Sequence, residues 1–190
     1  MRKYQAPPAY PQSPHSTAAG ARGAIDSFVQ GSLVDLFAAY NVAVAPRPRT
    51  LRISSPTLPD MSAAIGFSRQ PSGQQGRLSL SLPSSLLELM SPSTVGSLQS
   101  DWTRELANQL MGRIKNRLLP FNVRLRLGVS SGIESAKLAQ RLEASQDLRV
   151  YTGRALRGEL VVTLEGLPDD TELSYVGQTN TPSEGATLLF

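Results

Sequence analysis

Residues 100–119, SDWTRELANQLMGRIKNRLL, carry a helical pattern with two different faces, and this stretch constrains the fold more than any other. At about 100° per residue, its large apolar side chains fall on one broad face that a core would cover. These side chains are Trp102, Leu106, Ala107, Leu110, Met111, Ile114 and Leu118. Pro120 follows directly, and a residue that precedes proline disfavours helical backbone. The pattern therefore predicts a helix that ends before Pro120 and packs on a core through one face.

The opposite face of this helix has an unusual composition. Asp101, Glu105, Asn108, Gly112 and Lys115 follow one another at spacings of 4, 3, 4 and 3 residues. These spacings place them in one stripe about 80° wide, which we call the polar stripe. A solvated helix face usually carries Lys, Glu, Arg and Gln, whereas Asn and Gly are poor helix formers in an interior. We infer that something other than helix stability selected Asn108 and Gly112.

Length and composition exclude several classes of protein. With 190 residues and 40% apolar content, the chain is long enough for one domain with a core. It has no cysteine, and its single histidine, His15, lies in a Pro-rich stretch, so neither a disulfide framework nor a metal site built on Cys and His is predicted. No run of 18 apolar residues and no secretory signal is present, so we expect a cytoplasmic protein that does not span a membrane.

The net charge of +4 raises the question of an acidic partner. Much of the excess lies at Arg104, Arg113, Lys115 and Arg117 and on the following strand. The few aromatic residues are not interleaved with these charges, and no helix-turn-helix, RNP or zinc pattern is found, so the sequence does not favour nucleic-acid binding. A solvated basic surface or an acidic protein partner explains the charge as well.

The rest of the chain divides into a leader and a series of short elements. Residues 1–22 contain four prolines and no apolar periodicity, which predicts a disordered Pro-rich leader before a single domain at 23–190. Helices are predicted at 24–40, with Asp26 or Ser27 as the cap, at 85–90, capped by Ser84 and Ser85, and at 134–144. Strands are predicted at 42–45, 50–54, 63–68, 77–82, 121–129, 148–151, 159–164, 172–176 and 187–190. The alternation at 77–82 and 121–129 predicts strands with only one buried face.

The two halves of the domain are related by a displacement of 82 residues. GRLSLSL from Gly76 matches GELVVTL from Gly158, and the same displacement carries the helix from Ala24 onto the helix at Leu106. The agreement of both offsets predicts an α+β fold, a two-layer, pseudo-symmetric duplication of a helix and a hairpin. Its long helices would pack on one antiparallel sheet.

The chain shows little catalytic chemistry of its own. It has no nucleophile paired with a base, no Gly-rich phosphate loop before a helix, and no carboxylate cluster suited to a metal. Phosphoryl hydrolysis is compatible with this, because its catalysis is mostly positioning and charge stabilisation. A carboxamide such as Asn108 has an acceptor and two donors and can hold a water and a phosphoryl oxygen together. Glu105, one turn earlier, can fix the register by pairing with a lysine of the partner.

The pattern D-x-x-x-E-x-x-N-x-x-x-G, formed by Asp101, Glu105, Asn108 and Gly112, resembles the signature helix of the CheC/CheX/FliY chemotaxis phosphatases. ELANQLMGRIKNRL is most similar to the CheX branch. The helix IDSFVQGSLVDLF, an IGF strand and a G-x-L-x-L hairpin arm follow in the family's order. The resemblance covers residues 24–165, and it departs from the family in the arginines after Gly112, in the leader and in the closing TPSEGATLLF.

This resemblance implies a phosphatase acting on the phosphoaspartate of a CheY-like receiver domain in two-component signalling. It implies that Glu105 pairs with the receiver's active-site lysine and that Asn108 orients the attacking water. Asp101, Arg104, Gly112 and Lys115 would bind the partner. The chain would need no cofactor or metal of its own, since Mg²⁺ belongs to the receiver. The N-terminal helix lacks a second ExxN, so a single site and a CheX-like homodimer assembled through the sheets are implied.

Two alternatives remain open from the sequence. The first is a non-catalytic adaptor of the same fold that binds a receiver or a motility component through the same helix. The presence of both Glu105 and Asn108 argues against it, because a non-catalytic copy is expected to lose one of them. The second is a basic protein that binds nucleic acid or polar lipid surfaces.

Overall fold

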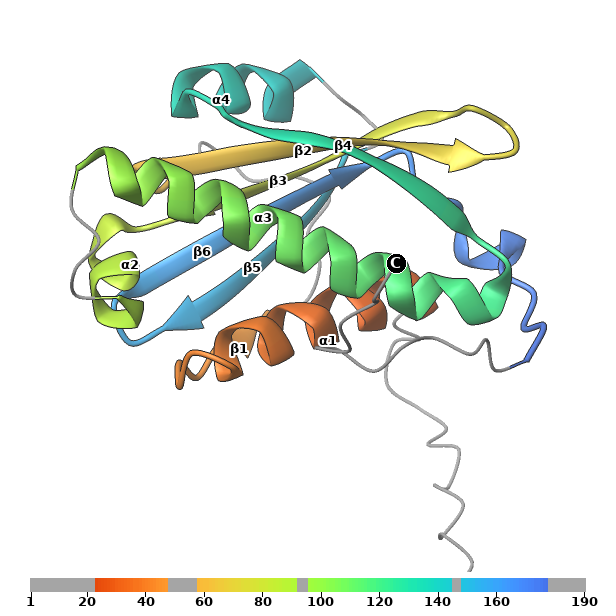
Figure 1. The fold of residues 1–190 in the computed structure, drawn as a ribbon, viewed down its shortest axis with the longest axis horizontal. Helices are drawn as coiled ribbons and strands as arrows, with labels where there is room; N and C mark the ends of the chain where they lie inside the picture. The colour runs from red at the N-terminus through yellow and green to blue at the C-terminus, as the bar shows by residue number, and fades with distance from the viewer. Residues whose placement is uncertain (1–22, 48–57, 92–95, 145–147, 178–190) are drawn as a thin grey trace, which may run out of the picture.

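The computed structural model describes residues 23–47, 58–91, 96–144 and 148–177. The predicted leader at 1–22 and the predicted strands at 50–54 and 187–190 lie outside these residues. Within the described residues, six strands form one sheet in the order β1-β5-β6-β3-β2-β4 (Figure 1). Every neighbouring pair is antiparallel. The strands are β1 (Ala45–Pro46), β2 (Met61–Gln70), β3 (Gln75–Leu82), β4 (Arg124–Gly132), β5 (Arg149–Ala155) and β6 (Gly158–Glu165).

Two long helices cover one face of this sheet. α1 (Ala24–Ala38) and α3 (Ser97–Leu118) lie together in front of the sheet in Figure 1, and α2 (Ser84–Met90) connects β3 to the loop before α3. α4 (Ser135–Ala144) packs on the other face, where Leu142 contacts a small cluster of Leu148, Val150 and Val161. Two single 3₁₀ turns follow α3 and β6: η1 (Leu119–Phe121) and η2 (Asp170–Glu172).

The core lies between the two long helices and the sheet. All the aliphatic residues of the predicted apolar face of α3, from Leu106 to Leu118, are fully buried, while Trp102 is half-buried at its edge. The facing residues of α1, including Ile25, Val29 and Leu36, are fully buried as well. Full burial of one such aliphatic side chain contributes about 1.5–3 kcal/mol. The amphipathic patterns of the two helices therefore supply the main apolar layer of the fold.

The predicted duplication is confirmed by the register of the two central strands. Leu80 of β3 pairs with Val162 of β6, which is its own counterpart at the displacement of 82 residues, so this pair lies at the centre of the duplication. This is the arrangement that a two-fold axis through the pair requires. The same displacement carries residues 24–36 of α1 onto residues 106–118 of α3. β2 and β5 correspond at a displacement of 88 residues, since Ala63 pairs with Leu80 and Tyr151 pairs with Val162. The strand order reads as two equivalent halves on either side of the central pair.

Several local predictions are wrong. The strand expected at 172–176 does not form, because η2 occupies 170–172 and the backbone N–H of Val176 donates to the carbonyl of Pro120 at 2.8 Å. β3 is buried on both faces, not one: Ser79 and Ser81 are only 2% and 0% exposed. Their polar side is covered where α4 approaches Ser79, and Ser81 Oγ shares a hydrogen bond of 2.8 Å with Ser62 Oγ.

The ends of some elements also differ from the predictions. The strand expected at 42–45 is reduced to the two residues of β1, and the strand expected from 121 begins at Arg124 because η1 occupies Leu119–Phe121. α3 begins three residues before the predicted start, after Gly96, whose φ is 64°. The arginines of β4 behave as predicted: Arg124 and Arg126 are exposed, whereas Leu125 between them is buried.

Candidate functional site

The polar stripe lies along the outer surface of α3, facing away from the sheet. Asp101 and Glu105 are exposed, and Asn108, Gly112 and Lys115 are partly exposed. The neighbouring positions Leu106, Ala107, Leu110 and Met111 are fully buried, so packing fixes the rotation of the helix about its axis. The same two-sided pattern that builds the core therefore determines which side chains a partner can reach.

Glu105 is held by a chain of hydrogen bonds that begins on α1. Gln109 Nε2 donates to Glu105 Oε1 at 2.9 Å, and the hydroxyl of Tyr40 donates to Gln109 Oε1 at 2.9 Å. Tyr40 follows the C-terminal end of α1 and packs edge-on against Trp102, with the ring centroids 5.5 Å apart. The second oxygen of the Glu105 carboxylate makes no hydrogen bond with a described residue and is available to a group outside the chain.

Asn108 is partly exposed one turn after Glu105. Within the described parts of the chain its carboxamide makes no hydrogen bond, so its acceptor and its two N–H donors are available to groups outside the protein. Because the backbone of α3 is fixed by its buried face, this amide is presented on a rigid element. Such a group can orient a water molecule and contact an anion together.

Gly112 leaves a gap in the polar stripe. A Cβ atom built on Gly112 would meet nothing within 4 Å, so the space above the helix is open at this position. Lys115 lies beyond the gap and makes no ion pair with any residue that the structure describes. A partner's backbone can therefore approach α3 closely between Asn108 and Lys115.

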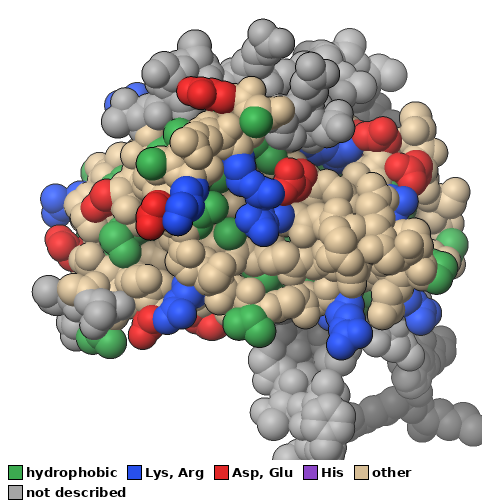
Figure 2. Space-filling model, turned by 90° about the horizontal axis from the view of Figure 1, so that it is seen from above, with side chains coloured by type: hydrophobic (Ala, Val, Ile, Leu, Met, Phe, Trp, Pro, Cys, Tyr) green, Lys and Arg blue, Asp and Glu red, His purple; other side chains and the backbone are tan. Residues whose placement is uncertain are grey.

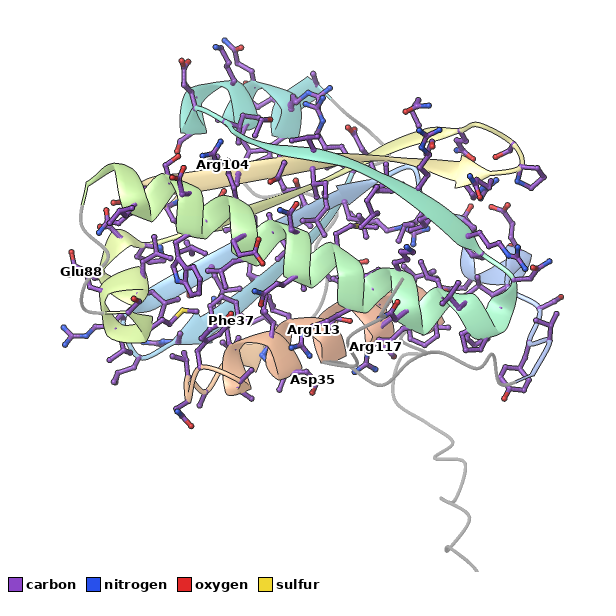
Figure 3. The ribbon with its side chains drawn as sticks, in the orientation of Figure 1. Asp35, Phe37, Glu88, Arg104, Arg113 and Arg117 are labelled. Atoms are coloured by element: carbon purple, nitrogen blue, oxygen red, sulfur yellow. The ribbon has the colours of Figure 1, made fainter. Side chains whose placement is uncertain are left out.

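The remaining charged residues of α3 have different positions. Arg104 pairs with Asp101 on the surface of the helix, with side-chain exposures of 41% and 59%, so this pair is solvated and contributes little to stability. Arg117 pairs with Asp35 of α1 at 2.5 Å. Figure 3 shows Arg113 and Arg117 extending toward α1, whereas Arg104 lies on the other side of α3. The arginines after Gly112 thus take part in packing between the helices.

The side of the molecule that carries α4 and β4 shows no single-sign patch among the described residues. Figure 2 shows Lys and Arg interspersed with Asp and Glu on the left of this face, and a broad area of backbone and uncharged side chains toward the right. Nucleic-acid binding relies on clustered positive charge. This face gives the nucleic-acid interpretation no support.

The counterpart of the site on α1 has different residues. At the displacement of 82 residues, Asp26 corresponds to Asn108 and Gly23 corresponds to Glu105. The hydroxyl of the buried Tyr151 donates to Asp26 Oδ1 at 2.8 Å, and a Cβ at Gly23 would collide with the carboxylate of Asp170. These positions on α1 therefore serve the packing of the N-terminal helix.

Two further features of the described residues bear on the chemistry. No three His, Cys, Asp or Glu side chains are grouped there so as to hold a metal ion. None of the helices in this part of the chain is long and apolar enough to cross a membrane.

Two residues near the site were not identified from the sequence. The spacing of four residues between Glu105 and Gln109 is typical of helical side-chain pairs and was a usable signal for Gln109. Tyr40 is 69 positions away from Gln109, and only the packing of α1 against α3 brings them together. No local pattern indicates such a contact.

Comparison with known proteins finds solved structures of the same fold. No protein-family model matches the chain, and no curated protein matches it. Solved structures do match. A CheC-like superfamily protein from Shewanella sp. PV-4 has a TM-score of 0.61 at 14% identity, over 74% of this chain and 96% of that one. The chemotaxis protein CheX from Vibrio vulnificus has a TM-score of 0.61 at 11% identity, over 74% and 97%.

A third similar structure extends the range of proteins with this fold. The FliM middle domain from H. pylori has a TM-score of 0.52 at 15% identity, over 74% of this chain and 86% of that one. At these identities the likeness concerns the fold. The predicted architecture, long helices on one antiparallel sheet with two related halves, is the architecture of the CheC-like and CheX structures.

Proposed function

From the CheC/CheX fold of this chain, we propose that it is a phosphatase that hydrolyses the phosphoaspartate of a CheY-like receiver domain. One observation carries the proposal: Asn108 presents an unbonded carboxamide on the exposed face of α3, one turn after Glu105. The resemblance of the D-x-x-x-E-x-x-N-x-x-x-G pattern gives these two residues their roles. The chemotaxis proteins of the same fold support the choice of partner.

In the proposed reaction, α3 docks on the receiver, which brings the aspartyl phosphate and its Mg²⁺. Asn108 accepts a hydrogen bond from a water molecule and donates one to a phosphoryl oxygen, so that the water lies in line with the bond to be broken. Water then attacks phosphorus, the bond between phosphorus and the aspartate oxygen breaks, and the aspartate carboxylate leaves. One proton of the water is released, and inorganic phosphate is the second product.

The remaining residues of the face bind the partner in this proposal. Glu105 pairs with the lysine of the receiver site, and this charge pair fixes the register of the two proteins. The gap at Gly112 admits the receiver's backbone close to the helix. Asp101, Arg104 and Lys115 surround the contact and affect mainly the rate of association, as charges at the rim of an interface do.

The proposal is tested by phosphate release from a panel of phosphorylated receivers encoded in the same genome. We expect the protein to accelerate phosphate release from at least one receiver, and Asn108→Ala to reduce that acceleration by about 100-fold, the scale for removal of one positioned polar group. Asn116→Ala is the matched control, because Asn116 is an exposed asparagine of the same helix outside the polar stripe. It is expected to keep the activity of the parent.

Two results would contradict the proposal. If Asn108→Ala and Asn116→Ala release phosphate at the parental rate, Asn108 does not orient the water. If the parent binds a phosphorylated receiver without accelerating its hydrolysis, the chain is a receiver-binding adaptor of this fold.

A further inference from the structure

We infer that Gln109 and Tyr40 are positioning residues for Glu105, so that the turn after α1 holds the receiver-binding carboxylate of α3 in place before the partner arrives. The inference rests on the proposed function for the role of Glu105. It concerns residues outside the signature pattern. The observation behind it is the pair of hydrogen bonds from Tyr40 to Gln109 and from Gln109 to Glu105, each 2.9 Å long.

The direction of this hydrogen-bond chain follows from the chemistry of its members. An ionised carboxylate only accepts, so Gln109 has to turn its Nε2 toward Glu105. Its Oε1 then points the other way and needs a donor. The hydroxyl of Tyr40 is that donor, because it gives its proton to Gln109 Oε1. If the amide were reversed, its oxygen would face the carboxylate and repel it, so the carboxylate selects the orientation of Gln109, and the hydroxyl of Tyr40 stabilises that orientation by donating to Oε1.

Tyr40 is itself fixed by packing that does not involve the polar stripe. Its backbone N–H donates to the carbonyl of Phe37 at 3.0 Å in the turn that ends α1. Its ring lies at 81° to the ring of Trp102, in the edge-on geometry that aromatic pairs favour. Tyr40, the first residue of this hydrogen-bond chain, is therefore a partly buried side chain in the turn after α1, and its fixed position restrains the exposed Glu105 through Gln109.

An exposed glutamate normally samples several rotamers and loses this freedom when it binds. Ordering one long side chain before binding removes a cost that is equivalent to about a 3- to 10-fold change in affinity. We therefore expect Tyr40→Phe to weaken binding of the phosphorylated receiver by about 3- to 10-fold while the hydrolysis rate at saturation stays the same. A merely structural role would lower both quantities together.

The first arm of the experiment needs no receiver. Relaxation of the ¹⁵N nucleus in the side-chain amide of Gln109 is measured in the parent and in Tyr40→Phe. The amide is expected to be rigid in the parent and mobile in the variant. Tyr175→Phe is the matched control, because Tyr175 is exposed, packs edge-on against Phe121 and makes no hydrogen bond through its hydroxyl within the described residues. A Gln109 amide that is mobile in the parent, or unaffected by Tyr40→Phe, overturns the inference.

The second arm measures receiver affinity in an Asn108→Ala background, so that the receiver stays phosphorylated during the titration. Tyr40→Phe is expected to weaken binding when Glu105 is present and to have no further effect when Glu105→Ala is added. An equal loss in both backgrounds overturns the positioning role. A parent that binds and dephosphorylates no receiver overturns the proposed function, and the relaxation arm then still decides whether Tyr40 orders the Gln109 amide that contacts Glu105.

Discussion

At the scale of single residues, the starts of α1 and α2 are capped by side chains from distant parts of the chain. The backbone N–H of Ile25 donates to Asp170 Oδ1 at 2.8 Å, so α1 is capped by a residue 145 positions later, and Asp26 and Ser27 are not its cap. The N–H of Ser84, the first residue of α2, donates to Asp60 Oδ1 at 2.9 Å. The predicted caps Ser84 and Ser85 are therefore wrong as well, because carboxylates from distant loops satisfy these donors.

Asp60 gives a pH-dependent prediction. Burial raises the pKa of Asp60, but hydrogen bonds from Ser84 and from nearby backbone N–H groups outweigh it and hold the pKa below its ordinary value. A carboxyl whose folded pKa is lowered stabilises the protein above its unfolded pKa of about 3.9, and this contribution is lost as the pH falls through the folded value. Asp60→Ala also removes the hydrogen bond that caps α2, so it should lower the free energy of unfolding by about 1 kcal/mol at neutral pH, the usual scale for an N-cap side chain.

Urea unfolding of the parent and of Asp60→Ala at several pH values measures this difference. The two proteins should converge in acid. Glu143→Ala is the control, since Glu143 is exposed on α4 and makes no ion pair with a described residue. A difference between parent and Asp60→Ala that persists unchanged below the folded pKa would show that the carboxylate is not the cap.

At the scale of elements, α3 combines two requirements that act on different residues. Its buried face needs volume and apolarity, which the sequence shows directly by periodicity. Its exposed face has Gly112 where helix stability would favour alanine. Since a Cβ at Gly112 would meet no atom within 4 Å, the folded chain itself gives no reason for this glycine. The proposed reason is the close approach of a receiver.

Gly112→Ala should therefore make the protein more stable and less active. Relative to alanine, a helix-interior glycine costs about 0.5–1 kcal/mol, so the free energy of unfolding should rise by that amount. Receiver binding should weaken, because the new methyl group fills the gap. Thermal unfolding and receiver titration measure the two effects. Gly31→Ala in α1 is the comparison: its Cβ would lie 3.3 Å from the guanidinium of Arg117, so it should stabilise less and leave receiver binding unchanged. Parental binding by Gly112→Ala would contradict the role of the gap.

The elements also show how far the sequence could be interpreted. The periodic apolar residues at 106–118 and 78–82 predicted α3 and β3, because each element turns one face toward the core and that face has to be apolar. The strand expected at 172–176 does not form, because Glu172 belongs to a 3₁₀ turn that is closed by a capping box with Asp169. Burial of Ser79 and Ser81 could not be predicted, since it depends on α4 crossing the second face of the sheet.

At the scale of the whole molecule, the two edge strands of the sheet differ although the duplication relates them. The outer strands β1 and β4 are equivalent by the two-fold relation, yet β1 has two residues and β4 has nine. β4 leaves an edge of backbone N–H and C=O groups without a strand partner among the described residues. Val129 on this strand is 92% exposed. Arg124 and Arg126 lie at the start of this edge, but residues 127–132 carry no charge, and a long uncharged stretch of edge favours pairing with another chain.

We therefore expect a homodimer in which β4 pairs with β4 of a second copy. Light scattering should give twice the mass of one chain. Val129→Lys, which places a charge in the middle of the edge, should shift the protein to the monomer, whereas Leu156→Lys at the exposed β5–β6 turn should not. A parent that is monomeric at high concentration, or a Val129→Lys variant that stays dimeric, would contradict this assembly.

In the proposed reaction Asn108 acts on the water and not on docking, and a single titration separates the two effects. Parent and Asn108→Ala are titrated against a phosphorylated receiver under single-turnover conditions, which gives an apparent Kd and a hydrolysis rate at saturation. We predict that the saturated rate of Asn108→Ala falls about 100-fold while its Kd changes by less than about 3-fold. A saturated rate equal to that of the parent, with or without a weaker Kd, would contradict it.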